Sequence, residues 1–462
     1  MFSLVLRTVS LSRTLWKLLT SYTFPIGPQL SANCLYVTDS RTGQSYNIKI
    51  HDGNYVDALD VAKIATLDWD GGKPVPRLLR ILDHGFNFTA CMKSSITHID
   101  GQRGTLKYKG HSIQDLFHDR VYEEVMYLLI WGNFPSDKQK VSLRKSMAEA
   151  MVPHQVVVDV ITAFPPKAET VTMVLAGLSA FLSSDTVMVA THHQQRPMFH
   201  GNLAEADAAI IRTIAYFASS IALVYCHKHG KSFAKPLEDK SLVQNILVMI
   251  GIDNNPQIEK VLTKLWILYA DHEMTNSTAA TLHAASTLND PMSAIMAGLA
   301  SGWGPLHGGA IDLAYEGFRE IGSVENIPAF IDRVKAKKAR LFGYGHRVYR
   351  TRDPRLGCIE QLIDENRAAV YGSPLLSIAM GIDKVATEDS YFTSRNLKAN
   401  ADLLGCFLYT ALGFDTDMIT VLICLSRVPG GLAHWRETLE KPIRLWRPQQ
   451  IYEAPSAVNT SK

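Results

Sequence analysis

From about residue 113 onward the chain repeats one pattern, in which apolar residues recur every three or four positions and each run ends at Gly, Pro or Asn. The pattern predicts helices over 123–131, 138–151, 170–181, 204–229, 242–250 and 258–270, then two within 279–300, and more over 327–339, 359–370 and 402–412. The most apolar of these, 170–181 and 204–229, are expected to cross the interior or a subunit interface. The sequence therefore predicts an all-helical protein.

Strand signals are confined to the start of the chain. Short β-prone runs on either side of residues 39–43 predict one hairpin, and residues 96–108 predict a second with its turn at Asp100-Gly101. Before them, residues 1–30 contain Arg7, Arg13 and Lys17, and no acidic residue occurs before Asp39. This composition is typical of a mitochondrial presequence, which favours the matrix. A loose tail without an address, in a cytoplasmic protein, is the alternative.

Charge and cysteine content exclude several classes of protein. Lys plus Arg minus Asp plus Glu is 47 − 44 = +3, too small an excess to indicate nucleic acid or a membrane surface as a partner. The six cysteines include no CxxC pair, so neither a zinc site nor a disulfide framework is predicted. The apolar stretches 170–184 and 213–226 are both shorter than the roughly 20 residues that span a bilayer. Because the net charge is so small, any anion must be bound by local arginines.

Two histidines have glycine-rich approaches. His307 lies in SGWGPLHGGA and His346 in GYGHRVYRTRDPR. Small flanking residues let backbone or substrate approach each imidazole. His307 is expected at the start of a helix, where the positive end of the dipole favours a neutral imidazole with a low pKa. After His346 come four arginines that indicate carboxylate or phosphate ligands: Arg347, Arg350, Arg352 and Arg355. A solvated basic loop is the other interpretation.

Two further polar positions carry chemistry of their own. His272 lies in YADHEMTN, where the position four residues later is Asn276 rather than the second histidine of a metalloprotease. It is therefore a hydrogen-bonding candidate, with a structural role as the alternative. Asp402 opens an otherwise apolar helix, where it is either an ordinary cap or first-turn acid, or a base beside an apolar wall.

Together these segments resemble the citrate synthase family. The motifs are WGPLHGGA, GYGHRVYRTRDPR, YADHE, NAD before an apolar helix, Arg427 in SRVPGGLAHW, Arg447 in RPQQIY, and IDGQRGTLKYKG near residue 100. They follow the family's order and cover about residues 90–453. The resemblance implies an all-α homodimer with a large domain at 31–307 and 413–462, and a smaller one at 308–412 that closes over the substrates.

The resemblance also implies the reaction, in which an acyl-CoA condenses with oxaloacetate and the thioester is then hydrolysed. Asp402 would remove the α-proton, His307 would donate a hydrogen bond to the thioester oxygen, and His346 would polarise and protonate the ketone. The oxaloacetate carboxylates map onto His272, Asn276, Arg355, Arg427 and a partner subunit's Arg447. The CoA contacts map onto Gly343, Gly345 and Arg350. No metal or permanently bound cofactor is implied.

Departures from the family pattern concern the acyl group. The family commonly has NVDFYSG around its base, whereas this chain has Asn-Ala-Asp-Leu-Leu-Gly-Cys from Asn400 to Cys406, and Ile311 replaces an asparagine after His307. The family's asparagine after His272 corresponds to Thr275 or Asn276. We expect a more apolar, roomier pocket beside Asp402, and an acyl group larger than acetyl, such as the long alkyl chain of the alkylcitrate synthases; the product would be citrate or an alkylcitrate. Propionyl-CoA, as in a 2-methylcitrate synthase, a catalytically silent scaffold and a reverse-running CoA-dependent lyase stay open as alternatives.

Overall fold

A computed structural model of the chain describes residues 33–70, 72–193, 198–252, 255–370 and 372–453. By their contacts these residues form two compact units. Unit 1 contains 33–92 and 449–453, and unit 2 contains 93–448. The predicted presequence lies outside the described residues. Residues 33–92, which the sequence assigned to the large helical domain, group apart from the helices here, and the boundary at 308–412 stays a prediction.

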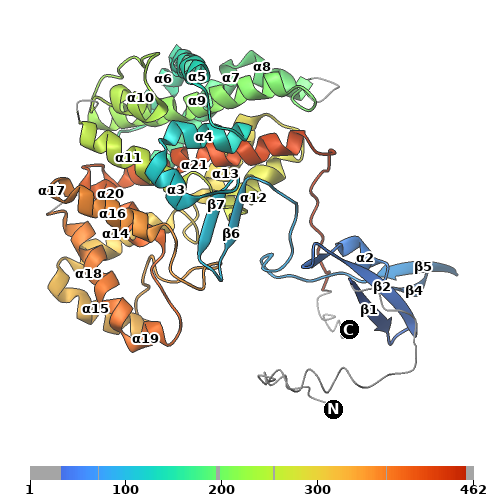
Figure 1. The fold of residues 1–462 in the computed structure, drawn as a ribbon. Helices are drawn as coiled ribbons and strands as arrows, with labels where there is room; N and C mark the ends of the chain where they lie inside the picture. The colour runs from blue at the N-terminus through green and yellow to red at the C-terminus, as the bar shows by residue number, and fades with distance from the viewer. Residues whose placement is uncertain (1–32, 71, 194–197, 253–254, 371, 454–462) are drawn as a thin grey trace, which may run out of the picture. The chain divides into compact units, whose positions relative to one another are not determined.

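Unit 1 is built from two small antiparallel arrangements of strands. Its elements are β1 Cys34–Asp39, β2 Gln44–His51, β3 Tyr55–Val56, α2 Ala58–Ala62, β4 Ala65–Asp70 and β5 Lys73–Leu78 (Figure 1). The sheet order β1-β2-β3 confirms the first predicted hairpin. The β4–β5 hairpin was not predicted, because Pro74 and Pro76 argue against a strand in sequence-based reasoning.

Unit 2 begins with a second three-stranded sheet and continues as helices. The sheet of β6 Thr97–Asp100, β7 Thr105–Tyr108 and β8 His111–Ser112 confirms the second predicted hairpin. The helices that follow are α3 Ile113–Asp119, α4 Tyr122–Trp131, α5 Asp137–Ala150, α6 Gln155–Thr162, α7 Thr170–Ser184, α8 Thr186–Ala190, η1 Thr191–His193, α9 Leu203–His229, α10 Leu242–Met249, α11 Pro256–Tyr269, α12 Asn276–Ala285, α13 Pro291–Gly302, α14 Ala310–Ile321, η2 Val324–Asn326, α15 Ile327–Lys335, α16 Leu356–Glu365, α17 Arg367–Val370, α18 Pro374–Glu388, α19 Ser390–Thr393, α20 Ala401–Ala411 and α21 Thr416–Leu439.

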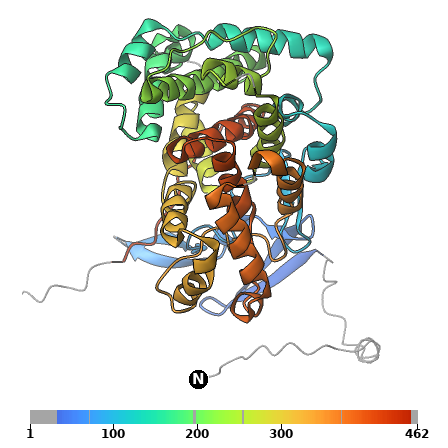
Figure 2. The same ribbon diagram turned by 90° about the vertical axis from the view of Figure 1, so that its left-hand side faces the viewer.

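The core of unit 2 is organised around two long apolar helices. Among the described residues α9 and α21 are long and apolar enough to cross a membrane, but 89% and 83% of their most apolar stretches are buried inside the structure. α21 runs through the middle of the unit and packs on α4, α9 and α13 (Figure 1). α18 packs on α14, α15 and α20, forming the helical group drawn in orange in Figure 2. His307 lies in the loop between α13 and α14, His346 lies in the loop between α15 and α16, and Asp402 lies in the first turn of α20.

Candidate active site

His307 lies in a tight turn between α13 and α14. The turn is closed by hydrogen bonds from the His307 N–H to the Gly304 carbonyl at 2.9 Å and from the Gly309 N–H to the Gly302 carbonyl at 3.1 Å. A Cβ at Gly309 would lie 2.0 Å from the Trp303 carbonyl oxygen, so that position requires glycine. α14 begins at Ala310, so His307 precedes the helix, close to the expected position.

The hydrogen bonds of the His307 ring decide where its proton is. Its Nε2 accepts a hydrogen bond from the Ser277 backbone N–H at 3.4 Å and lies 3.0 Å from Ser277 Oγ. An accepting Nε2 places the proton of the neutral ring on Nδ1. Burial, and next the charge of Arg427, lower the pKa of His307. The low pKa therefore has a different cause from the helix dipole that the sequence suggested.

The His346 loop is pinned against the start of α20. The Gly345 N–H donates to the Lys398 carbonyl at 2.8 Å, and the Asn400 N–H donates to the Gly343 carbonyl at 2.8 Å. Gly343 has φ +75°, and a Cβ there would lie 2.6 Å from Leu403. Glycine is needed at 343 for both reasons. This close approach brings His346 and Asp402 into one region.

His346 is also held as a neutral hydrogen-bond donor. Its Nδ1 accepts from the backbone N–H groups of Val348 at 3.0 Å and Tyr349 at 3.1 Å. The ring proton is therefore on Nε2, which can donate to a carbonyl oxygen. Burial lowers the pKa of His346, and the Arg355 charge lowers it further.

Asp402 belongs to the first turn of α20. Asn400 is the N-cap, and its Oδ1 accepts from the Asp402 N–H at 3.0 Å. The Asp402 side chain is half-buried and acts electrostatically on both His346 and Arg355. The structure gives the capping role to Asn400 and places Asp402 as an acid of the first turn, and its role as a base stays a prediction.

A buried ion pair between Arg355 and Asp353 connects the segment after His346 to the start of α20. Arg355 donates from Nε to Asp353 Oδ1 at 3.0 Å and from Nη2 to Oδ2 at 2.7 Å, and Oδ2 also accepts from the Ala401 N–H at 3.0 Å. Arg355 and Asp353 are 4% and 2% exposed. Burial would raise the pKa of Asp353, but the Arg355 guanidinium outweighs it and holds the pKa below its usual value. Asp353 thus fixes Arg355 and the start of α20 together.

His272 stands beside His346. The two ring centroids are 5.4 Å apart, and the Tyr349 hydroxyl is 3.3 Å from His272 Nε2. Burial, followed by the charges of Arg355 and Arg427, places the pKa of His272 well below its ordinary value. Arg427 of α21 donates from Nε to the Tyr269 carbonyl. Two arginines and two neutral imidazoles therefore share one neighbourhood.

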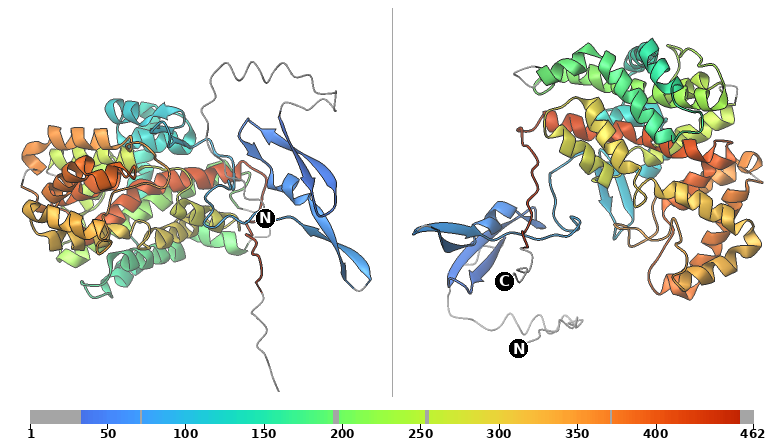
Figure 3. Two further views of the ribbon diagram at one scale, coloured as in Figure 1. Left: turned by 90° about the horizontal axis from the view of Figure 1, so that it is seen from below. Right: turned by 180° about the vertical axis from the view of Figure 1, so that it is seen from behind.

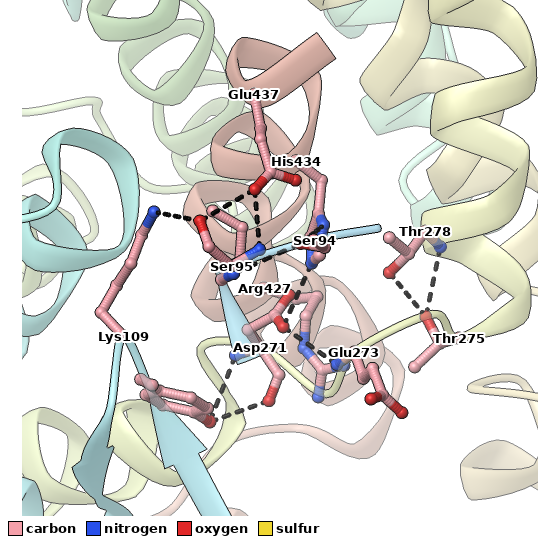
Figure 4. Close-up of polar contacts among 12 residues, drawn as sticks. Ser94, Ser95, Lys109, Asp271, Glu273, Thr275, Thr278, Arg427, His434 and Glu437 are labelled. Atoms are coloured by element: carbon pink, nitrogen blue, oxygen red, sulfur yellow. Dashed lines mark hydrogen bonds and ion pairs between the residues drawn. The ribbon is translucent and has the colours of Figure 1, made fainter. Parts of the chain in front are cut away.

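The residue before His272 anchors this neighbourhood in the core. Asp271 Oδ2 accepts from the Glu273 N–H at 2.9 Å and pairs with His434 Nε2 at 3.3 Å (Figure 4). The Tyr108 hydroxyl donates to the Asp271 carbonyl at 2.8 Å. Burial would lower the pKa of His434, but Asp271 raises it overall. The pair fixes the backbone on both sides of His272.

The remaining predicted site residues, Asn276, Arg350 and Arg447, are exposed. Asn276 is exposed and its Oδ1 accepts from the Ser301 hydroxyl, whereas Thr275 caps α12. The Arg350 N–H donates to the Gly101 carbonyl at 2.8 Å, and its exposed side chain lines a cleft of about 120 Å³ beside His346. Arg395 and Lys398 line the same cleft. Arg447 is exposed.

Sequence reasoning missed three supporting residues. Ser277 acts through its backbone N–H, which leaves no signal in a sequence, and Tyr349 acts through its hydroxyl on His272. The third is Asp353, whose place directly before Pro354-Arg355 could have marked it. A larger hollow of about 450 Å³ between α14, α18 and α20 is lined by none of the predicted site residues. In the part of the chain that the structure describes, no group of three His, Cys, Asp or Glu could hold a metal ion.

Comparison with known proteins identifies the family. The model of the citrate synthase C-terminal domain matches residues 85–449. A citrate synthase-like protein from Phoma sp. is 45% identical over 91% of this chain and 90% of its own, and the alkylcitrate synthase phiJ from Fungal sp. is 38% identical over 91% and 94%. The structure of Thermoplasma acidophilum citrate synthase in a ternary complex with carboxymethyl coenzyme A and oxaloacetate is 28% identical, with a TM-score of 0.73 over 81% of this chain and 97% of that one. The chain belongs to the citrate synthase family.

Proposed function

We propose that this protein condenses an acyl-CoA with oxaloacetate and hydrolyses the product thioester, and that its acyl group is larger than acetyl. Family membership supports the condensation itself. The observation that carries the proposal is the pair of neutral imidazoles, each with one ring nitrogen occupied by a backbone N–H and the other left as a donor. Two such donors, with a carboxylate nearby, match a reaction between two carbonyl compounds.

The first step is removal of a proton next to the thioester. In our proposal the Asp402 carboxylate takes the α-proton of the acyl-CoA, while the Nδ1–H of His307 donates to the thioester oxygen and stabilises the enol or enolate. A neutral imidazole suits this role, because it donates a hydrogen bond without giving up its proton to solvent at neutral pH. The Ser277 N–H keeps the ring in the required tautomer.

In the second step the enol carbon attacks the ketone carbon of oxaloacetate. The Nε2–H of His346 polarises the ketone and protonates the alkoxide that forms. We assign the two carboxylates to His272, Arg355, Arg427 and a partner subunit's Arg447, with Asn276 beside them. Arg355 reaches substrate with the part of its guanidinium that Asp353 does not use. Water then cleaves the thioester and releases CoA, whose contacts we assign to Gly343, Gly345 and Arg350.

The residues around Asp402 limit where a larger acyl group could lie. Leu403 and Leu404 replace an aromatic residue and a tyrosine of the family pattern, and both are buried. Gly405 replaces a serine, and the Tyr269 hydroxyl takes that space, because a Cβ at 405 would lie 2.3 Å from it. A long alkyl chain would therefore enter from the solvent side of Asp402 rather than along the buried face of α20. Relatives that include alkylcitrate synthases agree with this proposal.

An acyl-CoA panel tests the proposal. We expect oxaloacetate-dependent thiol release, with kcat/KM for hexanoyl-CoA above that for acetyl-CoA, and mass spectrometry identifying an alkylcitrate. Each CH₂ contributes only about 0.8 kcal/mol of burial, so acetyl- and propionyl-CoA should differ by a small factor. A strong acetyl preference refutes the larger acyl group. A propionyl optimum indicates a 2-methylcitrate synthase, and no release with any substrate indicates a silent scaffold.

Quaternary structure and location complete the proposal. We assign a homodimer, because the family resemblance gives one oxaloacetate contact to a partner subunit's Arg447, and Arg447 is exposed in this structure. The composition of residues 1–30 supports the mitochondrial matrix, with the cytoplasm as the alternative. A relative from Cucurbita maxima is named as glyoxysomal. Fusing residues 1–30 to a fluorescent protein tests the location, and diffuse fluorescence would refute import.

A further inference from the structure

Unit 1 buries too few apolar side chains to be stable by itself. Among its described residues the buried large apolar side chains are Ile48 and Ile64. Its exposed apolar side chains include Leu59, Leu67, Trp69, Val75, Leu78, Leu79, Ile81, Leu82, Phe86, Phe88, Ile451 and Tyr452. A β-unit of this size that buries so little needs another apolar surface to be stable. A second surface must therefore cover part of unit 1.

The β4–β5 hairpin shows which surface is to be covered. In its antiparallel register Leu67 faces Pro76, Trp69 faces Pro74 and Ala65 faces Leu78. Because directly opposed residues of a hairpin share a face, these six form one wholly apolar side. The other side carries Thr66, Asp68, Asp70, Lys73, Val75 and Arg77. Leu67 and Trp69 are 63% and 71% exposed, and the hairpin extends away from β1 and β2 (Figure 3).

The prolines decide how this hairpin can bind. Pro74 and Pro76 carry no N–H, so β5 lacks two of the donors that another strand would need to pair with it. Pairing of another strand with the edge of β5 is therefore disfavoured. The apolar side remains as the docking surface.

The identity of the covering surface follows from chain length. The Arg80 side chain donates from Nη1 to the Gln450 carbonyl at 3.1 Å, so the chain is fastened to unit 1 three residues after Arg447. Three residues span at most about 10 Å. This inference rests on the proposed function, in which Arg447 completes the site of a partner subunit. Unit 1 must then lie beside that partner. We propose that the apolar side of the β4–β5 hairpin docks on the helical unit of a second copy of this chain.

Photo-cross-linking in mixed-isotope protein tests this directly. A photoreactive amino acid replaces Trp69 on the apolar side or, as matched control, Val75 on the polar side, and chains labelled with ¹⁴N and ¹⁵N are mixed before irradiation. We expect position 69 to give cross-links that join the two isotopes and end within residues 93–448, and position 75 to give at least fivefold fewer. Cross-links only within one isotope, equal yields from both positions, or no cross-links from position 69 would overturn the proposal.

Sedimentation of variants gives a second readout. We expect the double variant Leu67→Ser with Trp69→Ser to raise the dimer dissociation constant at least tenfold, and Val75→Ser to change it less than threefold. An unchanged constant in the double variant contradicts the docking. Oxaloacetate-dependent thiol release by the wild-type protein is measured alongside. Mixed-isotope cross-links without thiol release would refute the proposed function alone, and thiol release with cross-links only within one isotope would refute the docking alone.

Discussion

Replacing Asp353 by asparagine tests whether one buried carboxylate fixes both Arg355 and the start of α20. Its Oδ1 accepts from the backbone N–H and Nε of Arg355, and its Oδ2 accepts from Arg355 Nη2 and the Ala401 N–H. An asparagine can keep one oxygen, but its NH₂ group then faces two donors. Arg355, 4% exposed, loses its counter-ion as well. Removing one partner of a buried pair costs about 3–5 kcal/mol, so Asp353→Asn should lower the free energy of unfolding by that amount.

Urea unfolding at pH 7 measures this change, and Asp364→Asn is the matched control. Asp364 pairs with Arg367 at 2.7 Å, but both side chains are well exposed, so its loss should cost about 0–1 kcal/mol. The pKa of Asp353 is lowered in the folded protein, so its contribution is present above its ordinary pKa and is lost as pH falls through the lower folded value. The KM for oxaloacetate should also rise. A change in unfolding free energy below about 1 kcal/mol, no larger than the control's, would refute the reasoning.

Three further predictions follow from the same contacts. In Gly343→Ala a residue with a side chain must adopt φ +75°, and its Cβ would press against Leu403. The kcat/KM measured by thiol release should therefore fall at least about tenfold. An unchanged kcat/KM would mean that this packing does not hold the loop. His434→Gln leaves Asp271 buried without its cation and should lower the free energy of unfolding, measured in urea, by about 3–5 kcal/mol. Because the folded pKa of His434 is raised, this loss should be full below pH 6.5 and should shrink as pH rises through the folded pKa. A loss that grows with pH would contradict this. The pKa of His346 is lowered, so if activity needs the neutral ring, the acid limb of the kcat/KM profile should lie below pH 6.5; a limb at or above pH 6.5 would contradict this prediction.

The elements that sequence reasoning located carry strong local signals. The run before Gly132 predicted a helix over 123–131, and α4 occupies Tyr122–Trp131 because Gly132 takes the left-handed conformation that ends it. The prediction of two helices within 279–300 was likewise correct, since α12 ends at Ala285, Asp290 caps α13 and Pro291 is the first residue of α13. The glycines around His307 predicted close backbone approach, and Gly309 requires it.

What sequence reasoning missed depends on contacts between distant segments. The β4–β5 hairpin contains two prolines, whose effect on pairing depends on the side of the strand that their nitrogens face. The tautomer of His307 is set by a backbone N–H thirty positions away in sequence, at Ser277. The low pKa of His307 follows from burial and Arg427, and neither can be seen in the sequence around it. Local patterns therefore located the candidate residues, while their protonation states required the fold.

Thiol release by the wild-type protein and by Asp402→Asn tests the central claim most directly. Asparagine has nearly the shape of aspartate but cannot take the α-proton. We expect the wild-type protein to release CoA from an acyl-CoA only when oxaloacetate is present, and Asp402→Asn to lower kcat by about 10²–10⁴-fold with little change in the KM for oxaloacetate. Wild-type kcat retained in Asp402→Asn, or thiol release that does not depend on oxaloacetate, would contradict it.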